Sequence, residues 1–228
     1  MSLINENSSL ADYQRLAEKV YGVANRRHFT MDGMLTNVQR FLMRGLKGIR
    51  KGDSDKIKLN TRIALSWFMS ILNQLQIDIE TAVWNRFPYL CSYCGNCPCV
   101  CKPMKGDRIT NLRIDESLRP KTFRGFQKMF AEIYPQTSHT LEHSGLHLAE
   151  ELGEFSEAFL KFRSTHTDAD FNEIVIEGAD LISCFMGLFN SLNFDISKEL
   201  EVSFKDGCPS CHSVPCKCEY NFVMNFKS

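Results

Sequence analysis

The chain has 228 residues, 43% of them hydrophobic and 24% charged, which is an ordinary composition for a globular protein. Lysine plus arginine and aspartate plus glutamate each number 27, so the chain lacks the basic surplus that is usual in proteins that grip duplex nucleic acid. We therefore expect no nucleic-acid partner. The N-terminal residues contain no signal-peptide pattern, and no segment approaches bilayer-spanning length, so we expect a cytoplasmic protein with no membrane partner.

The apolar pattern of the first 90 residues predicts helices. Phe41, Leu42, Leu46 and Ile49 recur at the spacing of one apolar helix face. No segment of the chain alternates apolar and polar residues convincingly as a strand does, so we predict an all-α fold. Trp67 and Trp84 could stack on a nucleobase, although packing in the core is the other interpretation.

A cysteine-rich segment, the first knuckle (residues 91–101), follows these helices. Its pattern is C-x2-C-x4-C-x-C, and four thiolates within eleven residues can form a tetrahedral zinc site. Disulfides and an iron–sulfur cluster are the alternatives, but clustered cysteines in a cytoplasmic chain favour metal binding. Cys97 lies outside the pattern and is either free or an alternative ligand. The predicted zinc ligands are Cys91, Cys94, Cys99 and Cys101.

The cysteine pattern returns 117 residues later, which predicts a tandem repeat. In that register 12 of the 35 residues at 67–101 are identical to those at 184–218, and a shift of 113 continues the match further upstream. We predict a first copy at 1–105, a linker at 106–120 and a second copy at 121–228. The second knuckle predicts a second structural zinc ion, bound by Cys208, Cys211, Cys216 and Cys218.

The second copy carries two helical patterns and a helix start. One apolar stripe steps by four and three residues between 148 and 162, through Leu148, Leu152, Phe155, Phe159 and Phe162. Residues 171–193 are apolar over a broad arc, which predicts a buried helix. Asp195 then predicts the N-cap of a short helix that runs towards Lys205.

Four carboxylates lie on the first two of these helices: Glu151, Glu154, Glu177 and Asp180. At about 100° per residue, each pair lies on one face, whereas Glu150 and Glu157 point to solvent. Buried carboxylates repel one another, so the group needs a cation, and magnesium prefers such hard oxygen ligands. Bound ions could polarise a phosphoryl group and activate water. The alternative is a pair of solvated acidic helix faces.

These residues resemble the MazG-like all-α nucleoside triphosphate pyrophosphatases. The matching strings are EELGEFSEA at 150–158, EGADLI at 177–182 and the LNFDISKEL segment, and the resemblance covers about 121–206. It implies a four-helix fold that works as a dimer or pseudo-dimer and cleaves a nucleoside triphosphate to the monophosphate and pyrophosphate with magnesium. It also implies that the four carboxylates bind the metal and that Lys205 contacts phosphate. The knuckles lie outside the family pattern and leave base and sugar open.

The first copy lacks the carboxylates. Val38, Phe41, Asn60 and Ile63 align with the four ligands, and these side chains cannot form a magnesium site. We therefore predict that the first copy is catalytically silent and that the two copies form a pseudo-dimeric helical bundle.

Histidines precede the first carboxylate pair. His139, His143 and His147 are four residues apart, and His147, one helical turn before Glu151, could contact substrate or metal unless the segment is only a solvated helix start. Cys184 has the character of a small core residue. We predict a hydrolase of phosphoric anhydrides that binds a nucleoside triphosphate or a related nucleotide, with homo-oligomerisation left open. The alternative is a zinc-stabilised nucleotide sensor or protein-interaction adaptor without turnover.

Overall fold

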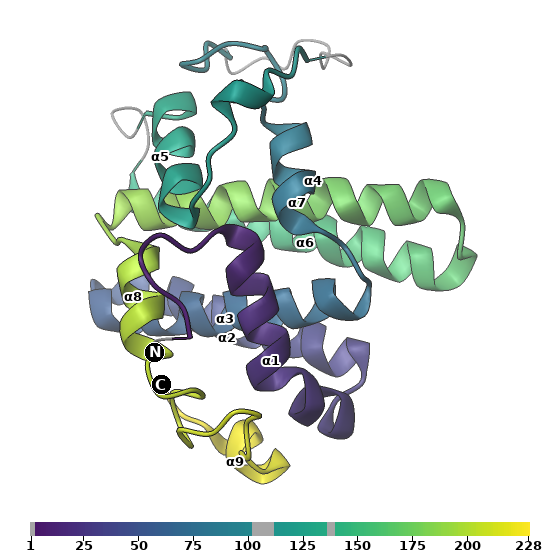
Figure 1. The fold of residues 1–228 in the computed structure, drawn as a ribbon, viewed down its shortest axis with the longest axis vertical. Helices are drawn as coiled ribbons and strands as arrows, with labels where there is room; N and C mark the ends of the chain where they lie inside the picture. The colour runs from purple at the N-terminus through teal and green to yellow at the C-terminus, as the bar shows by residue number, and fades with distance from the viewer. Residues whose placement is uncertain (1–2, 102–111, 136–139) are drawn as a thin grey trace. The chain divides into compact units, whose positions relative to one another are not determined.

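The computed structural model describes residues 3–101, 112–135 and 140–228 (Figure 1). The described residues form nine α-helices and one 3-10 helix and contain no strand, which confirms the predicted all-α class. The helices are α1 (Leu10–His28), α2 (Met31–Lys51), α3 (Ser54–Gln74), α4 (Ile79–Arg86), η1 (Glu116–Leu118), α5 (Phe123–Ile133), α6 (Leu141–Thr165), α7 (Asp168–Ser191), α8 (Ile196–Ser203) and α9 (Tyr220–Asn225). Within the predicted linker, residues 106–111 lie outside the described residues.

The chain divides into two compact units that do not follow the predicted copies. Unit 1 comprises residues 1–78 and 195–228, and unit 2 comprises residues 79–194. Unit 1 therefore contains α1, α2 and α3 together with α8, the second knuckle and α9. Unit 2 contains α4, the first knuckle, α5, α6 and α7. Each unit thus combines three helices of one predicted copy with the knuckle of the other and the short helix before that knuckle, and unit 1 also contains α9.

In unit 2 the long helices α6 and α7 lie side by side (Figure 1). Thr140 and Thr167 begin these helices as N-caps, each accepting a hydrogen bond from a backbone N–H three residues later. The predicted stripe faces the core: Leu148, Leu152, Phe155 and Phe159 are buried and Phe162 is half-buried. Because α4, α5 and α6 all pack on α7, this helix is buried over a broad arc, as its sequence predicts.

In unit 1, α2 and α3 form the main helix pair and α1 packs on α3. Gly52 ends α2 with a φ of 66°, in the left-handed region that glycine adopts without steric cost. Asp195 caps α8 as predicted, accepting hydrogen bonds from the N–H groups of Ser197 and Lys198. From the predicted apolar face of α2, the buried Phe41 ring lies 6.2 Å from the ring of Phe226 in the same unit.

The two knuckles make matching backbone contacts. Cys99 N–H donates to the carbonyl of Ile133 at 2.8 Å, and Cys216 N–H donates to the carbonyl of Val20 at 2.7 Å. These four residues pair under the sequence shifts of 117 and 113. Each knuckle is therefore tied to the first helix of the opposite predicted copy, at the middle of α1 and at the end of α5.

Helix α7 corrects one expectation about membranes. Its best 18-residue window has a mean hydropathy of 1.3, so by length and composition alone this helix could span a bilayer. However, 61% of that window is buried inside the protein, and the core helix of a soluble protein passes the same test. The result is weak evidence for a membrane segment.

Candidate functional site

Three of the four predicted magnesium ligands converge in unit 2. Oxygen atoms of Glu151, Glu177 and Asp180 lie within 4.8 Å of one another, and we call these residues the carboxylate cluster. They come together because α6 and α7 are neighbours and because residues three apart share a helix face. Glu154 is exposed and lies outside the cluster, although its charge still acts on Glu177.

The carboxylate cluster is electrostatically unfavourable without a cation. Burial, followed by the charges of Asp180, Glu154 and Glu151, raises the pKa of Glu177 to about 7. One oxygen of Glu151 and one oxygen of Glu177 are buried and have no hydrogen-bond partner. Unsatisfied buried carboxylate oxygens are costly, and a bound cation would satisfy both. The residues therefore fit a hard divalent metal ion.

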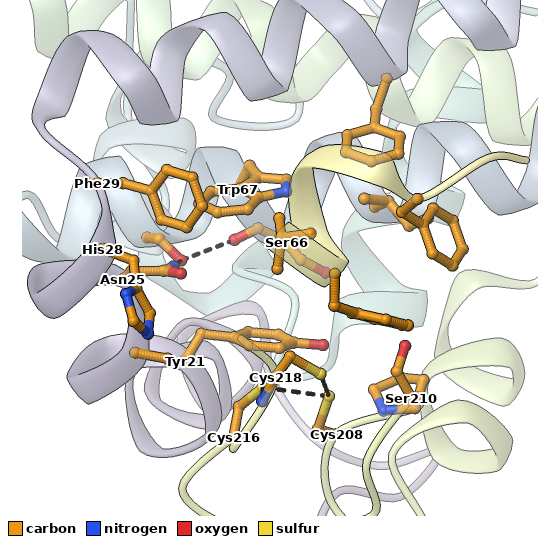
Figure 2. A pocket seen from close by; sticks show the side chains of 18 of the residues that line it. Tyr21, Asn25, His28, Phe29, Ser66, Trp67, Cys208, Ser210, Cys216 and Cys218 are labelled. Carbon is orange, nitrogen blue, oxygen red and sulfur yellow. Dashed lines mark hydrogen bonds between the residues drawn. The ribbon is translucent and has the colours of Figure 1, made fainter. Parts of the chain in front are cut away.

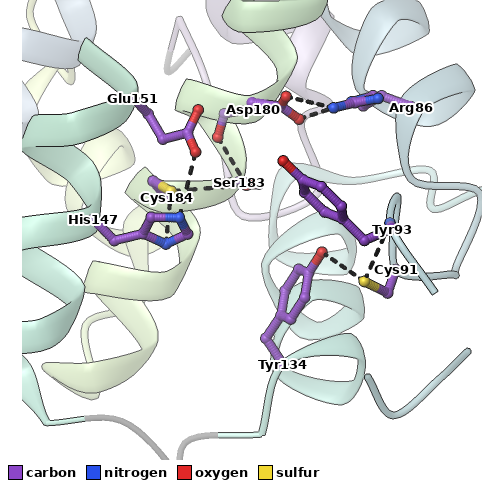
Figure 3. Close-up of polar contacts among 9 residues, drawn as sticks. All are labelled: Arg86, Cys91, Tyr93, Tyr134, His147, Glu151, Asp180, Ser183 and Cys184. Atoms are coloured by element: carbon purple, nitrogen blue, oxygen red, sulfur yellow. Dashed lines mark hydrogen bonds and ion pairs between the residues drawn. The ribbon is translucent and has the colours of Figure 1, made fainter. Parts of the chain in front are cut away.

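Arg86 provides one positive charge beside the carboxylate cluster (Figure 3). Its Nε and Nη2 atoms donate to the two carboxylate oxygens of Asp180 at 2.9 and 2.7 Å. The two side chains are only 15% and 12% exposed, so solvent screens this bidentate pair little. Burial raises the pKa of Asp180, and the hydrogen bonds and charge of Arg86 oppose that shift.

The sequence pattern gives no direct sign of Arg86. This residue ends α4, in the first predicted copy, and its aligned counterpart in the second copy is Ser203, which carries no charge. Chemistry alone could have indicated such a residue. An acidic cluster in a core needs a positive charge beside it, and a basic residue at the end of a buried helix can supply one. The site thus contains a residue of the copy that was predicted to be silent.

A histidine and a thiol extend the site (Figure 3). His147 Nε2 lies 3.3 Å from a carboxylate oxygen of Glu151, and His147 Nδ1 lies 3.5 Å from Cys184 Sγ. The hydrogen bond to Glu151 raises the pKa of His147, and burial opposes the shift. Cys184 is buried, which agrees with its predicted core character. His143 is exposed on the same helix, and His139 lies outside the described residues.

The first knuckle lies close to this site. Tyr134 donates a hydrogen bond to Cys91 Sγ at 3.5 Å. Burial, mainly, raises the pKa of the Tyr134 hydroxyl well above its usual range. The negative charges of Cys91, Cys99 and Asp180 act in the same direction. In Figure 3 the rings of Tyr93 and Tyr134 stand beside Cys91, on the same side as the Arg86–Asp180 pair. The knuckle is therefore part of the surroundings of the carboxylate cluster.

The four sulfurs of each knuckle converge, as the cysteine pattern predicts. The Cys91–Cys101 and Cys94–Cys99 distances are 3.8 and 3.9 Å, and the Cys208–Cys218 and Cys211–Cys216 distances are 3.9 and 3.8 Å. A tetrahedral ion with Zn–S bonds of about 2.3 Å requires sulfurs about 3.8 Å apart. All ten cysteines of the described chain are free thiols, and each knuckle can hold one metal ion.

The remaining predicted residues lie elsewhere. Lys205 follows α8 in unit 1, so it does not belong to the unit that holds the carboxylate cluster. Trp84 is fully buried in unit 2 and donates a hydrogen bond to Glu116 at 2.9 Å, which fits the core-packing interpretation. Trp67 is 9% exposed and lines a cavity in unit 1.

No protein-family model, curated protein or solved structure matches this chain. The resemblance to the MazG-like pyrophosphatases therefore stays a prediction. The residues themselves define an all-α protein with a partly buried carboxylate cluster and two four-cysteine clusters that can each hold a metal ion.

Proposed function

We propose that the chain is a magnesium-dependent nucleotide pyrophosphohydrolase whose site is the carboxylate cluster. The convergence of three carboxylates from α6 and α7, with buried unpartnered oxygens on Glu151 and Glu177, is the observation that carries the proposal. Oxygen-rich sites that leave room for water and phosphate suit magnesium. The substrate is a nucleoside triphosphate or a related nucleotide.

Glu151, Glu177 and Asp180 would hold the metal, and Glu154 would join them from the adjacent turn of α6. Bound magnesium would neutralise phosphate charge and make the attacking water more acidic. Each carboxylate oxygen has two lone pairs, so Asp180 can accept hydrogen bonds from Arg86 and still face a cation. Arg86 fixes the orientation of the Asp180 side chain before any ligand binds.

The reaction would join the oxygen of water to the α-phosphorus and break the bond from that phosphorus to the bridging oxygen, which leaves with pyrophosphate. The proton of the water would pass to a carboxylate of the cluster. His147, held by Glu151 with a raised pKa, would present a positive charge to the phosphates more often than an ordinary histidine. The guanidinium of Arg86 also has the fork geometry that suits phosphate oxygens.

In this proposal each knuckle holds one zinc ion with a structural role. The observed sulfur separations of 3.4 to 3.9 Å support this assignment. In the second knuckle, a hydrogen bond from Cys216 lowers the pKa of Cys208 to about 5, so one ligand would already be a thiolate at neutral pH.

A second candidate function is nucleotide binding without turnover. Two observations favour it: Glu154 does not converge with the other three carboxylates, and Arg86 already contacts both oxygens of Asp180. A zinc-stabilised sensor or adaptor needs the binding surface but not the full set of metal ligands.

Pyrophosphate release from mixed nucleoside triphosphates with magnesium separates the two functions. We expect release by the full chain and a loss of about 10²-fold or more in Asp180→Asn and Glu154→Gln. The matched control is Glu157→Gln, on the same helix at an exposed position, which should keep its activity. Nucleotide binding without release would favour the sensor, and near-normal activity in both variants would contradict the ligand assignment.

A further inference from the structure

A cavity of about 320 Å³ lies within unit 1, between its helices and the second knuckle (Figure 2). It is formed by residues of α1, α2, α3, the second knuckle and α9. Its volume falls within the range of small-molecule sites. Aromatic side chains dominate its wall, among them Tyr21, Phe29, Trp67, Phe204, Phe222 and Phe226.

Several of the aromatic rings stand at steep angles to one another. The rings of Phe29 and Trp67 meet edge to face with centroids 4.9 Å apart, and those of Tyr21 and Phe204 meet in the same way at 6.0 Å. Figure 2 shows Phe29 and Trp67 on one side of the cavity and Tyr21 on the other. Walls of this kind suit a flat ring, because stacking on aromatic faces tolerates many ring types.

Basic side chains and the sulfurs of the second knuckle form much of the polar part of the wall, with Cys208, Cys216 and Cys218 among the lining residues. Arg62 and His28 supply the basic groups, and no aspartate or glutamate is among the described lining residues. Arg62 also donates a hydrogen bond to Ser203 and lies 3.9 Å from a carboxylate oxygen of the half-buried Glu199, so an anionic ligand would compete with that long ion pair. Asn25, at the wall, donates a hydrogen bond to Ser70 at 2.9 Å. These basic groups distinguish the cavity from the carboxylate cluster in unit 2, which suits a cation.

Basic side chains also hold the segment that forms one wall. Arg40 donates to the carbonyl of Val223 at 3.0 Å, and Arg44 donates to the carbonyl of Phe226 at 2.9 Å. Val223 and Phe226 both line the cavity. The positive charges therefore lie directly behind this wall and add to the attraction for an anion.

The cavity includes positions that align with the carboxylate cluster. Under the shift of 117, Ile63 aligns with Asp180 and Trp67 aligns with Cys184, and both line the cavity. The first copy thus has a ring-lined space where the second copy has metal ligands. Without carboxylates this space cannot bind magnesium, but its shape and charge suit the organic part of a ligand.

We propose that this cavity is a second binding site, which takes a flat heteroaromatic ring that carries an anionic group, the chemistry of a nucleotide. Binding there needs no metal and leads to no hydrolysis. The proposal does not depend on the function proposed for unit 2, because all its residues belong to unit 1.

The two tryptophans allow a direct test in the full chain. Labelling with 5-fluorotryptophan gives two ¹⁹F NMR signals: Trp67 reports on the cavity, and Trp84, buried in unit 2, is the internal control. Without added magnesium, we expect adenosine or uridine monophosphate to shift the Trp67 signal only. The nucleoside alone should need about tenfold higher concentration, and ribose 5-phosphate should produce no shift.

Two variants locate the binding. Ala24→Phe adds a ring at a half-buried lining residue, and it should abolish the shift of Trp67. Arg62→Gln should remove most of the preference for the monophosphate over the nucleoside while nucleoside binding persists. No shift of Trp67 at millimolar nucleotide, or an unchanged preference in Arg62→Gln, would overturn the proposal even if Ala24→Phe failed to fold. Neither result depends on pyrophosphate release.

Discussion

At the scale of single residues, Glu177 is unusual because burial and neighbouring negative charges raise its pKa to about 7 from an ordinary 4.5. The folded protein therefore binds this proton more tightly than the unfolded chain does. Its contribution to stability is fully present below about pH 4.5 and is lost as pH rises through about 7. His147, whose pKa is also raised, changes stability in the same direction.

We predict that, without added magnesium, the melting temperature falls between pH 5 and pH 8, because Glu177 loses its proton there and the raised pKa of His147 acts in the same direction. Glu177→Gln should flatten this fall, since glutamine does not titrate. The comparison variant is Glu173→Gln, at an exposed position of the same helix, which should keep the wild-type slope. Calorimetry across the pH series measures the effect, and identical slopes in all three proteins would refute the assignment.

Arg86 is the second residue whose role can be measured. We predict that Arg86→Gln destabilises the protein by about 3 kcal/mol without magnesium, because it leaves Asp180 buried without its charged partner. Added magnesium should recover part of the loss by replacing the missing positive charge.

The control for Arg86 is an exposed ion pair. Arg15 and Asp12 are 69% and 46% exposed, so Arg15→Gln should cost under about 1 kcal/mol in urea titrations. Equal losses in Arg86→Gln and Arg15→Gln, or no effect of magnesium on Arg86→Gln, would show that the Asp180 pair has no special role.

At the scale of elements, the knuckles provide a matched pair of cysteine variants. Cys94 belongs to the four-sulfur cluster of the first knuckle, whereas Cys97 is exposed and lies outside it. We predict that the full chain contains two zinc ions, that Cys94→Ser contains one, and that Cys97→Ser still contains two. Because metal binding contributes to folding, only Cys94→Ser should lower the melting temperature. Elemental analysis decides, and a wild-type chain without zinc would contradict the prediction.

The helices themselves were largely predictable from the sequence. Residues 148–162 repeat their apolar side chains at helical spacing, and Asp195 carries the side-chain oxygen that a helix start needs, so α6 and α8 follow from local rules. Periodicity shows which face of a helix is buried but not which helix covers it. For this reason the contact of α4 with α7, and with it the place of Arg86, did not follow from the sequence.

At the scale of the whole molecule, the main feature is that each compact unit takes its knuckle, and the short helix before that knuckle, from the other predicted copy. Sequence alignment shows which residues correspond but not whether a contact forms within a copy or between copies. Both arrangements bury the same faces, as in domain-swapped dimers, so the sequence does not distinguish them. The predicted boundaries at 105 and 121 follow the repeat, whereas the units follow the contacts.

We predict different behaviour for two fragments of similar length. Residues 119–228 omit α4, Arg86 and the first knuckle, so unit 2 would lose the helix that covers part of α7. This fragment should be insoluble or should self-associate, because exposed apolar faces drive association. Residues 79–194 keep every helix of unit 2 and should fold with native-like helix content.

Light scattering and circular dichroism of the two fragments make the comparison. A stable, fully active monomer of residues 119–228 would show that the first copy is dispensable. An unfolded 79–194 fragment beside a folded 119–228 fragment would show that the stable units follow the predicted copies.

The division at residues 78 and 194 also sets the order in which the parts can mature during synthesis. Unit 2 is one continuous stretch of chain, whereas unit 1 needs residues 1–78 and residues 195–228 together. Although α1, α2 and α3 leave the ribosome first, the pieces that complete their unit leave it last. Unit 2 can therefore finish folding before unit 1. During that interval, the apolar faces of α1, α2 and α3 are the part of the nascent chain that most needs a chaperone.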